Sequence, residues 1–358
     1  MKRIYNDINL ASRNSFGVSE SARTIVEFDS VEDLKEIFRE ERPDKWYVLG
    51  AGNNTLFTKY YDGVIFTPTC SSLTILQDDG ECVDVRIEAA HDWDTLVEWS
   101  VNQGLWGIEN LSAIPSSVGA APVQNIGAYG AEVKDAITFV EYFDTNTLEV
   151  IRLSNAECCF AYRESIFKQE LRGVAIILAV EIRLCRTPRP NLGYGDVIKE
   201  VEARGGATLQ NIREAICAIR GRKLPDPKVL GNAGSFFKNP IVARGVAERL
   251  LSEYPEMPYY PVPNDESSVK LAAGWLIDHT GLKGYRDGNV GVHQNQALVL
   301  VNYGGATGGE VIALAKYVSE RVKDKFRFSN DILFAGESHF DITAAWLQGA
   351  TNIRHFLA

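Results

Sequence analysis

The chain has 358 residues, a formal net charge of −10, 45% hydrophobic residues and 23% charged residues. This composition is typical of a globular protein with a substantial core, and the length allows two or three domains. The acidic balance argues against nucleic acid or an anionic membrane surface as the main partner. No apolar run reaches the roughly 18 residues of a membrane span, and no signal peptide follows the basic start, so we expect a cytoplasmic protein.

The six cysteines show neither a CxxC motif nor a Cys/His spacing typical of metal ligands. We therefore expect them to be reduced, with several buried as small apolar side chains, and we expect no metal site. They are Cys70, Cys82, Cys158, Cys159, Cys185 and Cys217.

The first part of the chain alternates between strand and helix patterns. Thr24–Phe28 is strand-like, and Ser30 is placed to cap a helix with Asp33 three residues later. The apolar strand Trp46–Leu49 then runs into the glycine-rich turn Gly50–Thr55. This order is that of an α/β nucleotide-binding unit, although neither GxGxxG nor GxxxxGK[ST] is present. Taken alone, the turn fits a tight strand exit as well as a phosphate cradle.

The second part combines strands with a long glycine-punctuated loop. Alternation predicts strands over 82–88, 136–143 and 174–184, and a helix over 92–101. The run Ile114–Gly130 is small and nearly uncharged, so its backbone can approach a large flat ligand closely. A buried loop without a ligand is the alternative. Arg163, set among aromatic and apolar residues, is not a typical surface arginine.

The third part is predicted to be a small α/β lobe. Thr208 is placed to cap a helix, further helices are expected over 242–252, 268–279 and 310–322, and a strand over 296–302. The stretch Lys223–Pro240 places Ser235 between a glycine and two phenylalanines, with lysine and asparagine donors nearby. Such a Pro/Gly-rich stretch is most often a surface loop, but the other glycine-rich runs favour a ligand site.

Several long motifs, in order from Asn14 to Gly336, resemble the UDP-N-acetylenolpyruvoylglucosamine reductase family. They are NSFG, LGAGNN, IPSSVGAAPVQNIGAYG, AYRESIFK, GYGD, KLPDPKVLGNAGSFFKNP, SVKLAAGWLID and HQNQALVL. The loop Gly193–Asp196 and the uninterrupted SFFKNP are similar to the type I form of that family.

The resemblance implies an α+β and α/β flavoprotein of three domains. Two FAD-binding subdomains of the p-cresol methylhydroxylase kind would cover residues 1–68 and 69–207. A small substrate-binding domain would cover 208–336, and the tail 337–358 has no assigned role. The implied activity is the reduction by NADPH, through non-covalent FAD, of the enolpyruvyl ether of a UDP-sugar in peptidoglycan precursor synthesis. The implied protein is a cytoplasmic monomer without nucleic-acid or membrane partners.

The resemblance also implies roles for individual residues. The FAD-binding positions would be Gly50, Gly52, Asn53, Asn54, Ile114, Pro115, Ser116, Ser117, Gly119, Asn125, Gly127 and Ala128. The substrate-binding positions would be Tyr129, Tyr162, Tyr194, Lys223, Asn239 and Gln296. Ser235 would donate a proton, Arg163 would pair with the substrate carboxylate, and Asp331 would stand where the family has a glutamate.

Two other interpretations stay open at this point. One is an FAD-dependent oxidoreductase of the same fold with another substrate, against which the GYGD and SFFKNP motifs argue. The other is a nucleotide-sugar-binding homologue without catalysis, which the Asp331 substitution and the unassigned tail allow.

Overall fold

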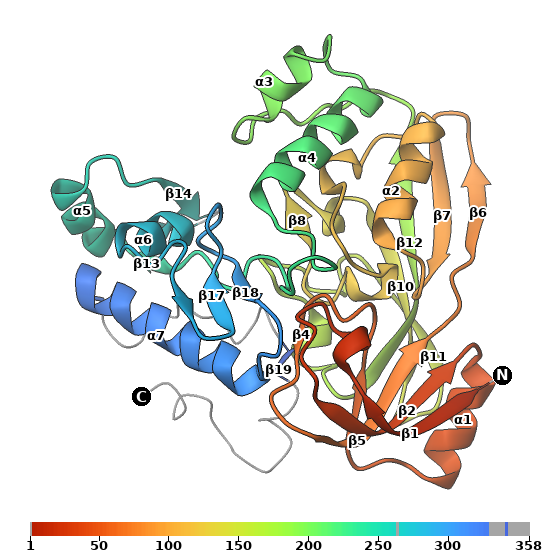
Figure 1. Cartoon of the computed structure of the whole chain (residues 1–358). Helices are drawn as coiled ribbons and strands as arrows, with labels where there is room; N and C mark the ends of the chain where they lie inside the picture. The colour runs from red at the N-terminus through yellow and green to blue at the C-terminus, as the bar shows by residue number, and fades with distance from the viewer. Residues whose placement is uncertain (1, 263–264, 329–340, 343–358) are drawn as a thin grey trace. The chain divides into compact units, whose positions relative to one another are not determined.

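The computed structural model describes residues 2–262, 265–328 and 341–342 (Figure 1). These residues form two compact units whose chain segments alternate. Among the described residues, the first unit comprises 2–8, 22–52 and 62–222, and the second comprises 9–21, 53–61, 223–262, 265–328 and 341–342. The three predicted domain ranges stay a prediction. Among the described residues, no helix combines the length and apolar character that crossing a membrane requires.

The first unit contains two sheets. The four-stranded sheet has the order β1-β2-β5-β3, with β3 and β5 parallel. Its strands are β1 (Arg3–Asn9), β2 (Ser21–Phe28), β3 (Trp46–Val48) and β5 (Tyr61–Pro68). Helix α1 (Val31–Glu40) packs on this sheet, and its start is the predicted one, because the Ser30 hydroxyl accepts from the Asp33 N–H.

The five-stranded sheet is antiparallel, in the order β11-β10-β12-β7-β6. Its strands are β6 (Leu73–Asp78), β7 (Cys82–Glu88), β10 (Ile137–Asp144), β11 (Val150–Ser154) and β12 (Ala175–Cys185). Helix α2 (Trp93–Asn102) lies against this sheet (Figure 1), and its side chains Trp93, Leu96 and Val97 share one core with those of β7. Strands β7, β10 and β12 and helix α2 confirm the predicted ranges to within a residue or two, whereas β6 and β11 were not predicted.

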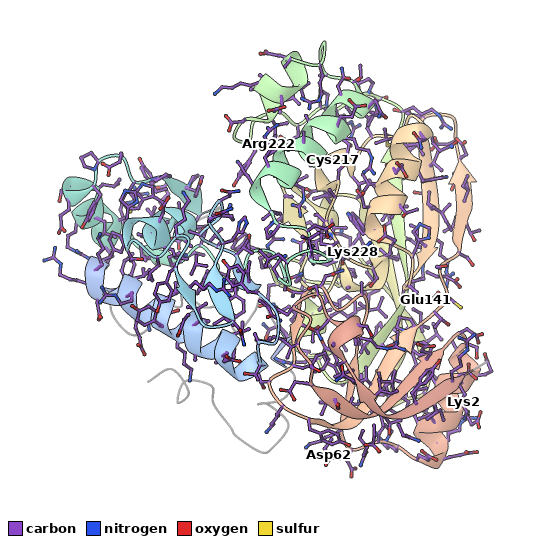
Figure 2. The ribbon with its side chains drawn as sticks, in the orientation of Figure 1. Lys2, Asp62, Glu141, Cys217, Arg222 and Lys228 are labelled. Carbon is purple, nitrogen blue, oxygen red and sulfur yellow. A yellow bond between two sulfur atoms is a disulfide. The ribbon has the colours of Figure 1, made fainter. Side chains whose placement is uncertain are left out.

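Two further helices of the first unit pack beside α2. They are α3 (Val197–Glu202) and α4 (Leu209–Lys223), and their apolar faces share a core with Val101 and Trp106. Arg222 lies near the end of α4 (Figure 2), and it donates to Glu200 of α3. Helix α3 was not predicted, because its single turn and a half is too short to show a helical period.

The second unit is built on one apolar core beneath its longest helix, α7 (Gly308–Phe326). Its other helices are α5 (Arg244–Glu253) and α6 (Ala273–His279). Its strands are β4 (Thr55–Leu56), β13 (Ile241–Ala243), β14 (Tyr259–Val262), β15 (Asp265–Leu271), β16 (Arg286–Asp287), β17 (Val290–Val292), β18 (Leu300–Asn302) and β19 (Asp341–Ile342). The backbone of β19 pairs in parallel with β4.

Two predicted elements of this unit are wrong in part. The helix predicted over 268–279 begins only at Ala273, because Ser268–Leu271 belongs to β15, which pairs with β13 and β14. The Asn239 side chain accepts from the Ala273 N–H, and so fixes the start of α6. The strand predicted over 296–302 is reduced to β18, because the Val299 N–H donates to the Gln296 carbonyl in a turn.

Gly308 is required for close packing at the start of α7. A Cβ there would lie 2.0 Å from the carbonyl oxygen of Phe57 and 2.7 Å from the Cα of Thr58. Both atoms belong to the backbone, so they cannot move away cheaply. Gly308→Ala is therefore expected to lower the free energy of unfolding by more than about 2 kcal/mol.

The neighbouring glycine provides a matched control. A Cβ at Gly309 would meet only the Thr307 hydroxyl, at 3.8 Å, so Gly309→Ala is expected to stay within about 0.5 kcal/mol of the original chain. Chemical denaturation measures both values. Equal effects of the two substitutions would contradict this packing argument.

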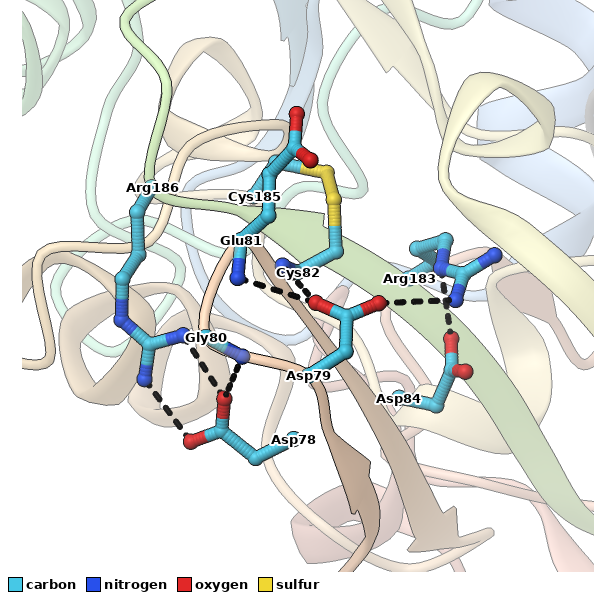
Figure 3. The surroundings of a disulfide bond; sticks show 9 residues. All are labelled: Asp78, Asp79, Gly80, Glu81, Cys82, Asp84, Arg183, Cys185 and Arg186. Atoms are coloured by element: carbon cyan, nitrogen blue, oxygen red, sulfur yellow. Dashed lines mark hydrogen bonds and ion pairs between the residues drawn. A yellow bond between two sulfur atoms is a disulfide. The ribbon is translucent and has the colours of Figure 1, made fainter.

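Cys82 and Cys185 form a disulfide (Figure 3), which contradicts the prediction that all six cysteines are reduced. The two residues are direct partners in the register of β7 and β12, and beside them the Arg186 N–H donates to the Glu81 carbonyl. They therefore occupy a non-hydrogen-bonded pair, where the Cα atoms of antiparallel strands come closest, here 4.0 Å. Because the two cysteines are 103 residues apart in the sequence, no local spacing rule predicts that they pair.

Alkylation tests this pairing directly. Unfolding without reductant is expected to expose four thiols to the reagent, those of Cys70, Cys158, Cys159 and Cys217, and prior reduction should raise the number to six. Intact mass spectrometry counts the labels. Six labels without reductant would show that the two sulfurs are not bonded.

Candidate functional site

The loop from Ile114 to Gly119 is fastened to the start of α2. The Trp93 N–H donates to the Ser116 carbonyl, and the N–H groups of Val118 and Gly119 donate to the carbonyls of His91 and Ala89. These bonds hold the loop flat against the end of β7. Because the Gly119 N–H is used in this way, the residue serves the loop by its small size: a Cβ there would lie 2.6 Å from that of Ala89.

The glycine-rich turn after β3 lies against the same loop. A Cβ at Gly50 would be 2.6 Å from the Ser117 hydroxyl, so a side chain at this position would force that hydroxyl to move. Gly52 has a φ of 68°, which favours glycine as well. The structure thus brings Gly50 and Ser117, predicted from two distant motifs, into contact within the first unit. Asn53 and Asn54 follow in the second unit and are half-buried.

Arg163 is half-buried beside the Asn125–Ala128 segment. Its guanidinium donates to the carbonyl of Gly127 at 2.6 Å and to that of Asn125 at 3.4 Å, while its Nε is buried without a hydrogen-bond partner. Burial lowers the pKa of Arg163 below its ordinary value. The Asn125 side chain is committed elsewhere, since its amide donates to Glu132 and to the Ala161 carbonyl. Arg163 therefore fixes the loop carbonyls and keeps donor capacity.

Three tyrosines and a second arginine lie near Arg163. Tyr129 packs against Tyr194 edge to face, with ring centroids 6.1 Å apart. The centroid of the Tyr162 ring lies 5.9 Å from the guanidinium carbon of Arg163. Arg220 of α4 interacts with the Tyr129 side chain, and its own pKa is lowered, mainly by burial and in part by the charge of Arg163. Two half-buried guanidinium groups that repel each other favour a bound anion.

Sequence reasoning missed Arg220 and also the ion pair that lies next to it on α4. Arg213 makes two hydrogen bonds to Asp94 of α2, at 2.6 Å and 3.0 Å. The seven-residue spacing of Arg213 and Arg220 places both on one face of α4, and this pattern is visible in the sequence. Their partners, however, lie far away in the sequence, since Asp94 is 119 residues from Arg213 and Ala113 is 107 residues from Arg220.

The Asp94 pair gives a pH-dependent contribution to stability. Burial acts to raise the pKa of Asp94, but the bonds from Arg213 and the Ala113 N–H outweigh it, so the pKa is lowered. A group with a lowered pKa stabilises the fold above the unfolded value near 4, and this stabilisation is lost as the pH falls through the folded pKa.

Asp94→Asn is accordingly expected to cost about 1 kcal/mol at pH 7, a modest value because solvent screens a partly exposed pair. The difference from the original chain should shrink below pH ~4, where the carboxylate is protonated. Denaturation of the FAD-free proteins at pH 7 and pH 3 measures it. A difference that does not change with pH would contradict this assignment.

Ser235 lies in the second unit on a rigid backbone and is exposed. Its backbone forms an isolated antiparallel β-bridge with Val299. The next residue, Phe236, donates its N–H to the Leu298 carbonyl at 2.7 Å. Before it, Gly234 has a φ of 70° and donates its N–H to the Asn232 side chain. These contacts hold the hydroxyl at the surface of its unit.

The motif at Asn14–Gly17 contacts the segment that carries Ser235. The Asn232 N–H donates to the Ser15 carbonyl, and the Asn302 side chain donates to the Phe16 carbonyl. A Cβ at Gly231 would lie 2.3 Å from that same Phe16 carbonyl oxygen. Three distant motifs of the sequence thus meet under Ser235.

Asn239 and Gln296 come together at the start of α6. Asn239 bonds the Ala273 N–H, and a Cβ on the next residue, Gly274, would lie 3.5 Å from the Gln296 side-chain oxygen. The Gln296 side chain also accepts from the Leu298 N–H at 3.3 Å, which ties it to the Ser235 segment. Lys223 is the last residue of α4 and is exposed.

The other residues predicted for the site differ in burial and in position. Asp331 lies outside the described residues. Ile114 and Ser116 are half-buried, Pro115 is exposed, and Ala128 pairs with Ala131 in a short hairpin. In the described part of the chain, no three His, Cys, Asp or Glu side chains are arranged to hold a metal ion.

Two family models match the sequence. The model described as UDP-N-acetylenolpyruvoylglucosamine reductase, C-terminal domain, matches residues 226–329, and the model described as FAD binding domain matches residues 22–154. A solved structure of UDP-N-acetylenolpyruvylglucosamine reductase from Thermus caldophilus covers 94% of this chain and 99% of its own, with a TM-score of 0.65. At 22% identity, that likeness shows the fold.

Curated relatives match most of the chain at higher identity. The UDP-N-acetylenolpyruvoylglucosamine reductase of Chromobacterium violaceum is 46% identical over 89% of this chain and 95% of its own length. Those of Flavobacterium johnsoniae and Photobacterium profundum are 42% identical, over 90% and 94% of this chain and 96% and 97% of their own. These matches confirm the predicted mixed α/β flavoprotein fold, and the chain belongs to the UDP-N-acetylenolpyruvoylglucosamine reductase family.

Proposed function

We propose that this chain reduces the enolpyruvyl ether of UDP-N-acetylglucosamine enolpyruvate to UDP-N-acetylmuramate, with NADPH as donor and FAD as bound cofactor. The reaction belongs to peptidoglycan precursor synthesis and takes place in the cytoplasm, and the enzyme acts as a monomer. The observation that carries the proposal is the 46% sequence identity to the UDP-N-acetylenolpyruvoylglucosamine reductase of Chromobacterium violaceum, over 95% of that protein's length.

The residues of the first unit fit an FAD. Gly50 and Ser117, from the two predicted FAD motifs, lie so close that a Cβ at Gly50 would be 2.6 Å from the Ser117 hydroxyl, which supports one FAD site formed by both motifs. Arg163 and Arg220 supply positive charge where a flavin or substrate anion would need it. The isoalloxazine ring and ribityl chain are assigned to Ile114–Gly119 with Asn125, Gly127 and Ala128. Gly52, Asn53 and Asn54 are assigned to the diphosphate.

When bound, FAD would supply the hydride chemistry that links NADPH oxidation to addition at the terminal alkene carbon of the substrate. Negative charge then spreads into the neighbouring carboxylate, and the α-carbon needs a proton. The Ser235 hydroxyl is assigned as the proton donor. Its rigid backbone and exposed position support that role. A serine is a weak acid in water, but a carbanionic centre is a far stronger base.

Arg163 is assigned to the substrate carboxylate, because a planar guanidinium matches a delocalised anion through two hydrogen bonds. Its buried, unpartnered Nε supports this assignment. Tyr129 and Tyr162 are assigned to positions near the sugar and flavin, and Tyr194 is assigned to the diphosphate and uridine. Lys223, Asn239 and Gln296 are assigned to the diphosphate and uridine, and Asp331 to orienting the proton donor.

The proposal is tested with the purified holoprotein. NADPH oxidation should depend on UDP-N-acetylglucosamine enolpyruvate, and mass spectrometry should find a product heavier by two hydrogen atoms. NADPH oxidation that ignores this substrate would refute the proposed reaction while leaving a flavin oxidoreductase possible. A protein that binds no FAD would refute the enzyme assignment altogether.

A further inference from the structure

The residue that opens the proposed flavin loop has an unfavourable backbone conformation. Ala113 has a φ of 57°, in the left-handed region that favours glycine. Its Cβ makes this conformation costly, so surrounding contacts must hold it. Ala113 immediately precedes Ile114, the first residue assigned to FAD, and its conformation sets the direction in which the loop leaves.

Charged side chains bind both polar groups of Ala113. The Asp94 carboxylate accepts from its N–H at 2.6 Å, and the Arg220 Nε donates to its carbonyl at 3.0 Å. Hydrogen bonds to charged groups are the strongest that a backbone makes. The backbone of Ala113 is therefore clamped from α2 and from α4.

Arg213 holds the Asp94 carboxylate in place. Its guanidinium binds both carboxylate oxygens, at 2.6 Å and 3.0 Å, and one of these oxygens is the acceptor of the Ala113 N–H. Only 12% of the Arg213 side chain is exposed, against 33% for Asp94, so the arginine is the more rigid partner. Fixed in this way, Asp94 cannot turn away from Ala113.

The helix that carries Asp94 also holds the next part of the loop. Asp92 and Ser117 form a bridge, and the Trp93 N–H donates to the Ser116 carbonyl. The capping residue Asp92 and the first two residues of α2 thus bind the loop from Ala113 to Ser117, and Asp94 is the one that binds it through a charged side chain.

We infer that Asp94 and Arg213 are positioning residues that set the conformation of the flavin loop, and hence FAD affinity and the environment of the ring. The inference rests on the proposed FAD site. Neither residue touches the reacting atoms. They act through the N–H of Ala113. The Asp94 carboxylate accepts a hydrogen bond from this N–H, and Arg213 holds the carboxylate in the orientation that this bond requires.

The test compares Asp94→Asn with a matched pair elsewhere in the same unit. Arg152 of β11 binds both carboxylate oxygens of Glu181 on β12, at 2.8 Å and 2.6 Å, and their contacts are with the sheet. Glu181→Gln therefore removes an ion pair of the same type without touching Ala113. Apoprotein of each variant is titrated with FAD, thermal unfolding is measured in parallel, and the visible spectrum of bound FAD is recorded.

Asp94→Asn is expected to weaken FAD binding by about tenfold or more, and to shift the flavin absorption bands, with Glu181→Gln unchanged in both. Arg213→Lys, the milder change, should give a smaller loss, and the double variant Asp94→Asn with Arg213→Lys should add little to Asp94→Asn alone. Comparable thermal destabilisation of Asp94→Asn and Glu181→Gln is compatible with these results.

Two outcomes would overturn the inference. In the first, the Asp94→Asn variant binds FAD with the affinity of the original chain and shows the same flavin spectrum. The other is an equal loss of affinity in Asp94→Asn and Glu181→Gln, which would show a general structural effect. Failure of the original chain to bind FAD would instead refute the proposed function on which the inference rests.

Discussion

Replacing Ser235 by alanine is expected to leave the reduction of bound FAD by NADPH at its original rate and to slow re-oxidation by the enol ether substrate by about 10²–10⁴-fold. The hydroxyl is assigned to the proton that reaches the α-carbon, and this proton is needed only in the second half-reaction. Stopped-flow absorbance follows the two half-reactions separately.

The substitution removes one oxygen from an exposed position whose backbone is held by Val299 and Leu298, so the fold should be unchanged. Ser252→Ala serves as control, because the hydroxyl of this exposed serine of α5 donates to the Arg249 carbonyl of its own helix. It should affect neither half-reaction. Equal slowing of both half-reactions in Ser235→Ala would show that the hydroxyl is not the proton donor.

Arg163→Lys is expected to slow re-oxidation by substrate by about 10²–10³-fold, the loss seen when a donor to a developing oxyanion is removed. Lysine keeps the positive charge but cannot bind the Gly127 carbonyl and a carboxylate with one planar group. Rapid-reaction kinetics of the substrate half-reaction and an FAD titration measure the change.

The contact with Gly127 predicts a second, smaller effect. Because Arg163 also fixes a carbonyl of the proposed flavin loop, FAD affinity should fall by about tenfold or less. Arg152→Lys is the control, since this arginine pairs with Glu181 on the sheet. If Arg163→Lys lowered FAD affinity alone and left the substrate half-reaction intact, Arg163 would be a structural residue of the loop.

Local patterns predicted the regular elements of this chain because their signals are local. The Ser30 cap and the alternation of Cys82–Glu88 each depend on a few neighbouring residues, and the structure contains both. The family and the flavin fold were predicted from long motifs. The same motifs contain Gly50 and Gly119, whose requirement for a missing Cβ only the structure explains.

Pairings across long sequence distances could not be predicted in this way. Cys82 faces Cys185 through strand register, and Asp94 meets Arg213 through helix packing. The helical pattern at Ser268–Leu271 predicts the wrong structure, because the pairing with β13 and β14 makes this segment a strand. Arg220, which joins Tyr129 and Ala113, was missed for the same reason.

The proposed function depends most directly on one rate. NADPH-reduced protein, mixed without oxygen with UDP-N-acetylglucosamine enolpyruvate, should recover the absorbance of oxidised FAD at least as fast as steady-state turnover. Re-oxidation no faster than in buffer alone would contradict the assignment of this chain as the reductase of that substrate.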